Sequence, residues 1–127
     1  MTVVVAYAPD EFGEAALVAA AAEARSKEVP LVVVNATRGD SYVDPHYATQ
    51  EQVAALRERF AGQDVEVLQD VVDDVAAEVV RVAEARGAQL VVVGIRHRSP
   101  VGKALMGSVS QRILLDAPCP VLAVKPS

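Results

Sequence analysis

Short, mostly apolar runs alternate along the chain with longer segments in which apolar residues recur at helical spacing. Five short runs predict buried strands, at residues 3–7, 31–35, 65–68, 90–93 and 121–125. Four longer segments predict helices, at residues 13–26, 49–62, 73–87 and 109–115. Because strands and helices alternate strictly, and the strands are apolar throughout, the pattern predicts an α/β fold. We expect an open five-stranded parallel sheet with helices on both faces.

Capping signals mark several of the predicted helix ends. Thr49 and Gln52 have the spacing of a capping box, and Gly87 stands where the third helix should end. The apolar stripe of that third helix is predicted to comprise Ala76, Val79, Val80 and Ala83. The polar stretch 37–48 is long for a connection in this architecture, which makes it a candidate lid or partner surface. His46, within it, is predicted to be an exposed loop residue.

Length and composition predict one domain over residues 1–127, with 52% hydrophobic residues. No apolar run approaches the ~20 residues that span a bilayer. We expect no secretory signal, because no basic segment and no cleavage site come before the first predicted strand. We therefore expect no membrane partner. Cys119 is the single cysteine, so an internal disulfide is ruled out. We predict that Cys119 is a packing residue. These features predict a cytoplasmic protein.

The charge distribution argues against nucleic acid as a partner. The formal net charge is −5, so the chain repels polynucleotide phosphates unless its basic residues cluster. The one dense basic cluster, Arg96, Arg98 and Lys103, is too small for a duplex and well sized for one small anion.

A glycine-bearing loop carries the strongest chemical signal. It runs from Gly94, where the fourth strand ends, to Gly107 and Ser108, where the last helix begins. Helix N-termini offer unpaired N–H groups and a partial positive charge, so they favour anions such as phosphate. Ser108 with Gln111 also has the spacing of a capping box, which would satisfy the helix by itself. Both interpretations of Ser108 stay open.

The loop resembles that of the universal stress protein family. Gly94, two residues, His97, nine residues and Gly107-Ser108 keep the register of the family's nucleotide-binding motif. Residues 110–125 are similar to the family's ending, and residues 4–17 to its first strand and helix. The resemblance implies a sheet of order 3-2-1-4-5 and a homodimer. It also implies a regulatory stress-response protein that binds ATP or AMP, with or without Mg²⁺.

The resemblance also implies roles for individual residues. Gly94 would lie under the ribose, and Gly107, Ser108 and Val109 would meet the phosphates. The adenine pocket would comprise Pro9, Val34, Ala36 and Val93. Asp10 is the candidate ribose ligand, although a gapless alignment puts Ala8 at the family's acidic position. Arg96 and His97 complete the predicted set, as side chains of the phosphate loop.

His97 stands where the family's motif has its middle glycine, and this departure opens an alternative. A side chain there can block the close approach of phosphate, or its imidazole can donate to phosphate. The rival hypothesis is therefore a ligand-free dimerisation module. We expect no enzyme, because a metal-holding group and an oriented nucleophile cannot be assembled from this sequence, although slow ATP hydrolysis is not excluded. The last strand is expected to be an apolar edge that pairs across a two-fold axis.

Overall fold

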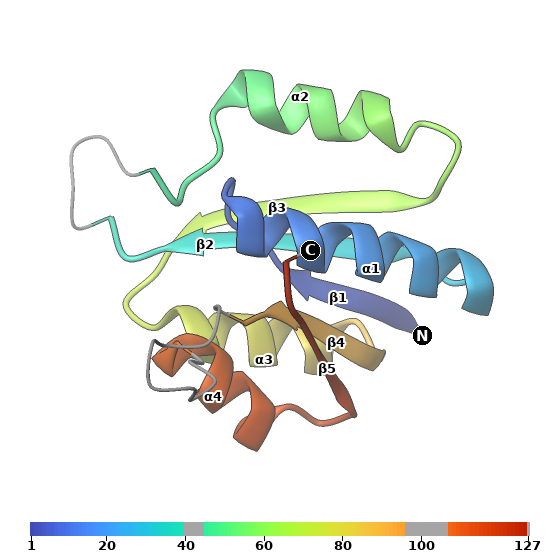
Figure 1. The fold of residues 1–127 in the computed structure, drawn as a ribbon. Helices are drawn as coiled ribbons and strands as arrows, with labels where there is room; N and C mark the ends of the chain where they lie inside the picture. Colours follow the sequence, from blue (N-terminus) through green and yellow to red (C-terminus); the bar gives the residue numbers. More distant parts are fainter. Residues whose placement is uncertain (40–44, 96–106, 127) are drawn as a thin grey trace.

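Five parallel strands form a single sheet in a computed structural model that describes residues 1–39, 45–95 and 107–126 (Figure 1). The elements are β1 (Thr2–Ala6), α1 (Glu11–Lys27), β2 (Leu31–Thr37), α2 (Gln50–Arg59), β3 (Val65–Val71), α3 (Val75–Ala85), β4 (Ala88–Gly94), α4 (Ser108–Asp116) and β5 (Val121–Val124). The strand order is β3-β2-β1-β4-β5, and every neighbouring pair is parallel. The predicted fold class and strand order are confirmed.

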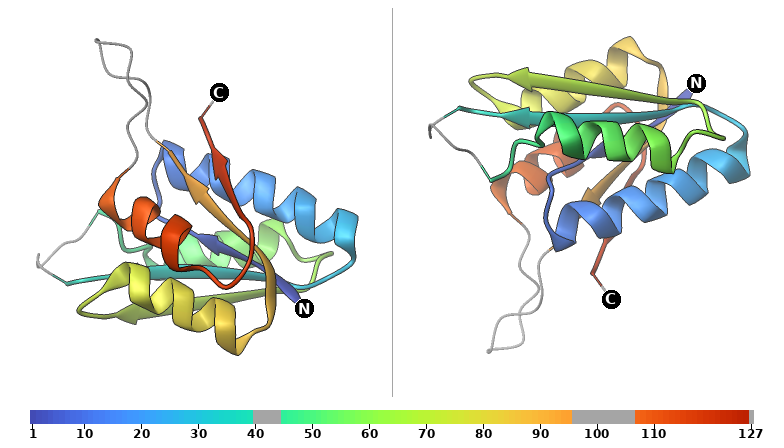
Figure 2. Two further views of the ribbon diagram at one scale, coloured as in Figure 1. Left: turned by 90° about the horizontal axis from the view of Figure 1, so that it is seen from below. Right: turned by 90° about the horizontal axis from the view of Figure 1, so that it is seen from above.

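The helices cover both faces of the sheet, so the central strands are buried on both sides (Figures 1 and 2). In β1, Val3 and Val5 pack with α1, whereas Val4 packs with α3 and α4. All three valines are fully buried. Because successive side chains of a strand point to opposite faces, a strand covered on both faces needs apolar residues at every position. This explains why the predicted strands lack alternation.

The structure corrects the predicted stripe of α3. Its buried residues are Ala76, Val79, Val82 and Ala83, with Val82 in place of Val80. Val82 follows Val79 by three residues and so stays on the face that meets the sheet. Gly87 ends this helical segment with a φ of +59°, as predicted.

Two glycines allow backbone segments to approach closely at the carboxyl end of the sheet. A Cβ at Gly13 would lie 1.9 Å from the carbonyl oxygen of Ala8, and one at Gly94 would lie 2.5 Å from that of Phe12. The first turn of α1 is thereby pressed against the end of β1 on one side and the end of β4 on the other. This contact sets the position of α1 relative to both strands.

We expect Gly13→Ala to destabilise the protein by about 2 kcal/mol, because the overpacking cost exceeds the ~1 kcal/mol that alanine gains in helix propensity. Urea denaturation measures the loss. Gly62→Ala is the matched control, since Gly62 is exposed and a Cβ there meets nothing within 4 Å. Equal stability of the two variants would contradict the close approach.

Candidate functional site

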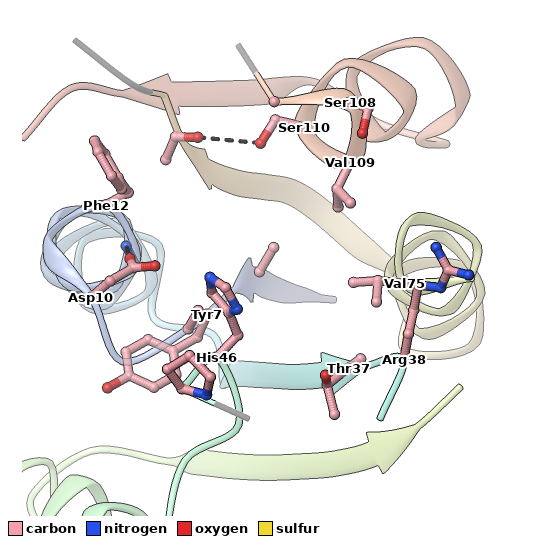
Figure 3. A pocket seen from close by; sticks show the side chains of 17 residues that line it. Tyr7, Asp10, Phe12, Thr37, Arg38, His46, Val75, Ser108, Val109 and Ser110 are labelled. Atoms are coloured by element: carbon pink, nitrogen blue, oxygen red, sulfur yellow. Dashed lines mark hydrogen bonds between the residues drawn. The ribbon is translucent and has the colours of Figure 1, made fainter. Parts of the chain in front are cut away.

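A cleft of about 570 Å³ opens at the carboxyl end of the sheet (Figure 3). Its walls come from the ends of β1, β2 and β4, the first turns of α1 and α4, and residues 45–46. The sheet order places β2 on one side of β1 and β4 on the other, so the chain leaves β1 at the point where the strand order reverses. In open α/β sheets this switch point is where ligands bind. Both the volume and the place are those of a small-molecule site.

The N-terminus of α4 forms one wall of the cleft. Gly107 is the N-cap, with extended backbone (φ −63°, ψ 157°), and no side-chain hydrogen bond caps the helix in the described part of the chain. The predicted capping box of Ser108 and Gln111 is therefore wrong, because Ser108 is already the first helical residue. The hydroxyl of Ser110 donates to the carbonyl of Gly94 at 3.2 Å, which ties α4 to the end of β4.

The other three helices have side-chain caps. Asp10 accepts from the N–H of Gly13 at 2.7 Å, and Asp74 accepts from that of Ala77 at 3.1 Å. Thr49 forms the predicted capping box with Gln52, which is confirmed. Cap oxygens satisfy the same N–H groups that an external anion would use. Among the helices of the described residues, α4 thus keeps its positive end available to the cleft.

Asp74 also fixes the direction of α4. Its carboxylate accepts from the guanidinium of Arg112 at 2.7 Å, linking the start of α3 to α4. The hydrogen bond from Arg112 is the main reason that the pKa of Asp74 lies below its ordinary value, and the N–H of Ala77 adds to it. The charged pair is exposed, so it contributes little to stability.

The wall opposite α4 combines a carboxylate with a phenol. Asp10 lies at the start of α1 and points its carboxyl group toward the cleft while capping the helix. Tyr7 follows β1, and burial is the main cause that raises its pKa; the charges of Glu14 and Asp10 act in the same direction, and that of Arg59 opposes them. Its hydroxyl points away from the other cleft side chains in Figure 3.

A buried amide holds the remaining wall in place. Asn35, near the end of β2 and only 1% exposed, donates to the carbonyls of Tyr7 (2.9 Å) and His46 (2.8 Å). Its Oδ1 accepts from the N–H of Ala48 (2.7 Å) and from Gln69 Nε2 (3.1 Å). The Gln69 amide also donates to the carbonyl of Ala48 (2.8 Å). Segment 45–48 is thus fixed against the sheet, with His46 at the cleft.

The structure brings together six of the predicted site residues and separates the others. Asp10, Ala36, Gly94, Gly107, Ser108 and Val109 line the cleft. Val34 and Val93 lie instead in the core beneath it, because they come before the ends of their strands, where α3 and α4 cover the sheet. Pro9 is half-buried and does not line the cleft. Arg96 and His97 lie outside the described residues, as do Arg98 and Lys103.

Several cleft residues were not singled out by the sequence. Tyr7, Thr37 and Arg38 belong to the strand ends where a site was expected, but nothing in the pattern selected them individually. His46 was predicted to be exposed, which is confirmed, yet its place in the cleft wall was missed. The only feature of the sequence that pointed to the segment containing His46 was the unusual length of stretch 37–48.

No group of three or more His, Cys, Asp or Glu residues in the described part of the chain could hold a metal ion. None of the helices in those residues combines the length and apolar character needed to cross a membrane.

The fold and the cleft define an open, doubly wound α/β protein with its site at the switch point, and comparisons identify the family. The family model described as universal stress protein family matches residues 1–125. A universal stress protein of Mycolicibacterium smegmatis is 44% identical over 126 residues, which cover 98% of this chain and 97% of that protein. The chain therefore belongs to the universal stress protein family, and the resemblance found in its sequence is confirmed.

Two solved structures from Archaeoglobus fulgidus share the fold. One is a universal stress protein with a TM-score of 0.73 and 30% identity, with 98% of both chains covered. The other is a universal stress protein in complex with dAMP, with a TM-score of 0.66, 25% identity and the same coverage.

We expect Asn35→Ala to destabilise the protein by about 3 kcal/mol, because buried backbone groups of Tyr7 and Ala48 lose their partners. Urea denaturation measures the loss, and hydrogen exchange at the Ala48 amide reports the release of segment 45–48. Gln63→Ala is the control: its amide binds the carbonyl of Ala21 at 3.0 Å, away from the cleft. It should cost about 1 kcal/mol and leave Ala48 protected. Unchanged protection in Asn35→Ala would contradict the assigned role.

Proposed function

We propose that the protein binds an adenine nucleotide, AMP or ATP, in the cleft and acts as a cytoplasmic regulatory protein in a stress response. One observation carries the proposal: the N-terminus of α4 opens into the cleft without a side-chain cap, while the other three described helices are capped by Asp10, Thr49 and Asp74. A phosphate there would receive hydrogen bonds from backbone N–H groups and the favourable end of the helix dipole.

The rest of the cleft suits a nucleoside. Ala36, Val75 and Val109 supply apolar surface for the nucleoside, and they come from β2, α3 and α4. At the other wall, Asp10 faces the cleft and has one carboxylate oxygen engaged by Gly13. Its second oxygen can accept from a sugar hydroxyl. The dAMP complex of the Archaeoglobus fulgidus relative supports a nucleotide as the ligand class.

We further infer a binding role rather than an enzymatic one. Two of the cleft residues with hydroxyl or carboxylate groups have structural partners: Ser110 donates to Gly94, and Asp10 caps α1. Phosphoryl transfer requires a group that orients the attacking nucleophile. The hydroxyl of Ser110 and one carboxylate oxygen of Asp10 are instead engaged in hydrogen bonds to the protein backbone. Partner proteins would then distinguish the nucleotide-bound from the nucleotide-free protein by contacting the walls of the cleft.

The contribution of the α4 backbone can be isolated with proline. Ser108 is the first helical residue, where proline is favoured, and the backbone of Gly107 already has the extended conformation that a residue before proline needs. Ser108→Pro removes one N–H and the hydroxyl, whereas Ser108→Ala removes only the hydroxyl. We expect the proline variant to bind AMP about 10-fold more weakly than the alanine variant by calorimetry.

Equal affinities of the two variants would place the phosphate elsewhere. A wild-type protein that binds neither AMP nor ATP at millimolar concentration would contradict nucleotide binding altogether, and would favour the ligand-free interaction module.

We also propose that the protein forms a homodimer through β5. This strand ends the sheet, and the carbonyls of Pro120 and Val124 accept hydrogen bonds from β4. Because backbone groups alternate in direction along a strand, the N–H and C=O groups of Val121 and Ala123 face away from β4. An apolar strand with an unpaired edge is a template for another chain, and pairing two copies across a two-fold axis satisfies it.

Ala123→Pro tests this edge, because proline removes an outward N–H while the hydrogen bonds to β4 remain. We expect the wild type and the control Ala123→Thr to sediment as dimers at micromolar concentration, and Ala123→Pro as a monomer. A dimeric proline variant would assign the interface to another surface, and a monomeric wild type would rule the dimer out.

A further inference from the structure

Three of the chain's few ring-bearing residues line the cleft. The chain has only three Tyr and two Phe residues, no Trp and two His. Tyr7, Phe12 and His46 all line this cleft. They come from the end of β1, the first turn of α1 and segment 45–48, and Figure 3 draws Phe12 and Tyr7 apart, with the imidazole of His46 between the walls of the cleft. An aromatic or imidazole ring that faces a cleft favours a ligand with a planar ring.

His46 is the ring among them that is both exposed and anchored. Its side chain extends into the cleft on the side of Tyr7 and Asp10, while Arg38 and Val75 lie on the opposite side (Figure 3). Its carbonyl is held by Asn35 at 2.8 Å, and two residues later both backbone groups of Ala48 are held as well. A contact surface fixed in advance loses little conformational entropy on binding.

We propose that His46 selects a planar base by stacking its imidazole on the base of the bound nucleotide. This inference rests on the proposed function, and it defines the orientation of the bound nucleotide. The base lies against His46, and the phosphate lies at the N-terminus of α4. Imidazole is one of the rings on which nucleic-acid bases stack in proteins. Stacking tolerates different bases, so His46 would distinguish nucleotides from sugar phosphates rather than one purine from another.

Asn35 and Gln69 act here as positioning residues. They do not line the cleft, and they reach the ligand only through the backbone of segment 45–48.

The test compares ligands that contain the base with one that lacks it. Calorimetry on the full chain would measure AMP, adenosine and ribose 5-phosphate. We expect His46→Ala to weaken the binding of AMP and of adenosine by the same factor, about 10-fold. The affinity for ribose 5-phosphate should stay unchanged. His46→Phe keeps a ring and should retain most of the affinity for AMP. Tyr47→Ala is the matched control, since it removes a ring from the same segment outside the cleft.

The possible results separate the two proposals. A wild type that binds no AMP defeats nucleotide binding itself. AMP binding that survives His46→Ala defeats only the stacking role, as does His46→Phe binding as weakly as His46→Ala. An equal loss for ribose 5-phosphate would show that His46 supports the whole cleft rather than the base. The AMP affinities of the two His46 variants decide the question even where the sugar phosphate binds too weakly to measure.

Discussion

The side-chain amide of Asn35 joins three backbone segments at the carboxyl end of the sheet. It has two N–H donors and an oxygen with two acceptor positions, and all four are used, by Tyr7, His46, Ala48 and Gln69. A buried amide with a missing partner is costly, so the network stabilises the fold only when it is complete. Completeness requires the end of β1 and segment 45–48 to take their observed places, and these places define the cleft.

Electrostatics then divides the cleft into two ends. The acidic caps of α1 and α3 satisfy the positive ends of those helices from within the protein. At α4 the cap is Gly107, which has no side chain to offer. The same helix is oriented by the Arg112–Asp74 pair and by Ser110 on Gly94. The fold therefore delivers one helix terminus to the switch point with no side-chain cap from the described residues, in a chain whose net charge is negative.

The sequence predicted the architecture well because its signals are local. Continuous apolar strands, helical spacing, the Thr49 capping box and Gly87 each depend on neighbours within a few residues, and all agree with the structure. Of the two interpretations of Ser108, the capping box is wrong, because a capping box and a first helical turn look alike in sequence. Only the backbone of Gly107, extended and already the cap, separates the two.

What the chain determined by itself is the order of its elements, the two-sided burial of its sheet and the family to which it belongs. The tertiary structure decided which residues reach the cleft. Val34 and Val93 belong to the same strands as the cleft residues Ala36 and Gly94, but they lie one or two positions earlier, where α3 and α4 cover the sheet. His46 reaches the cleft through hydrogen bonds to Asn35, eleven residues earlier in the chain. Hydrogen bonds between residues that lie far apart in the chain produce no periodic pattern in the sequence, so only the folded chain reveals them.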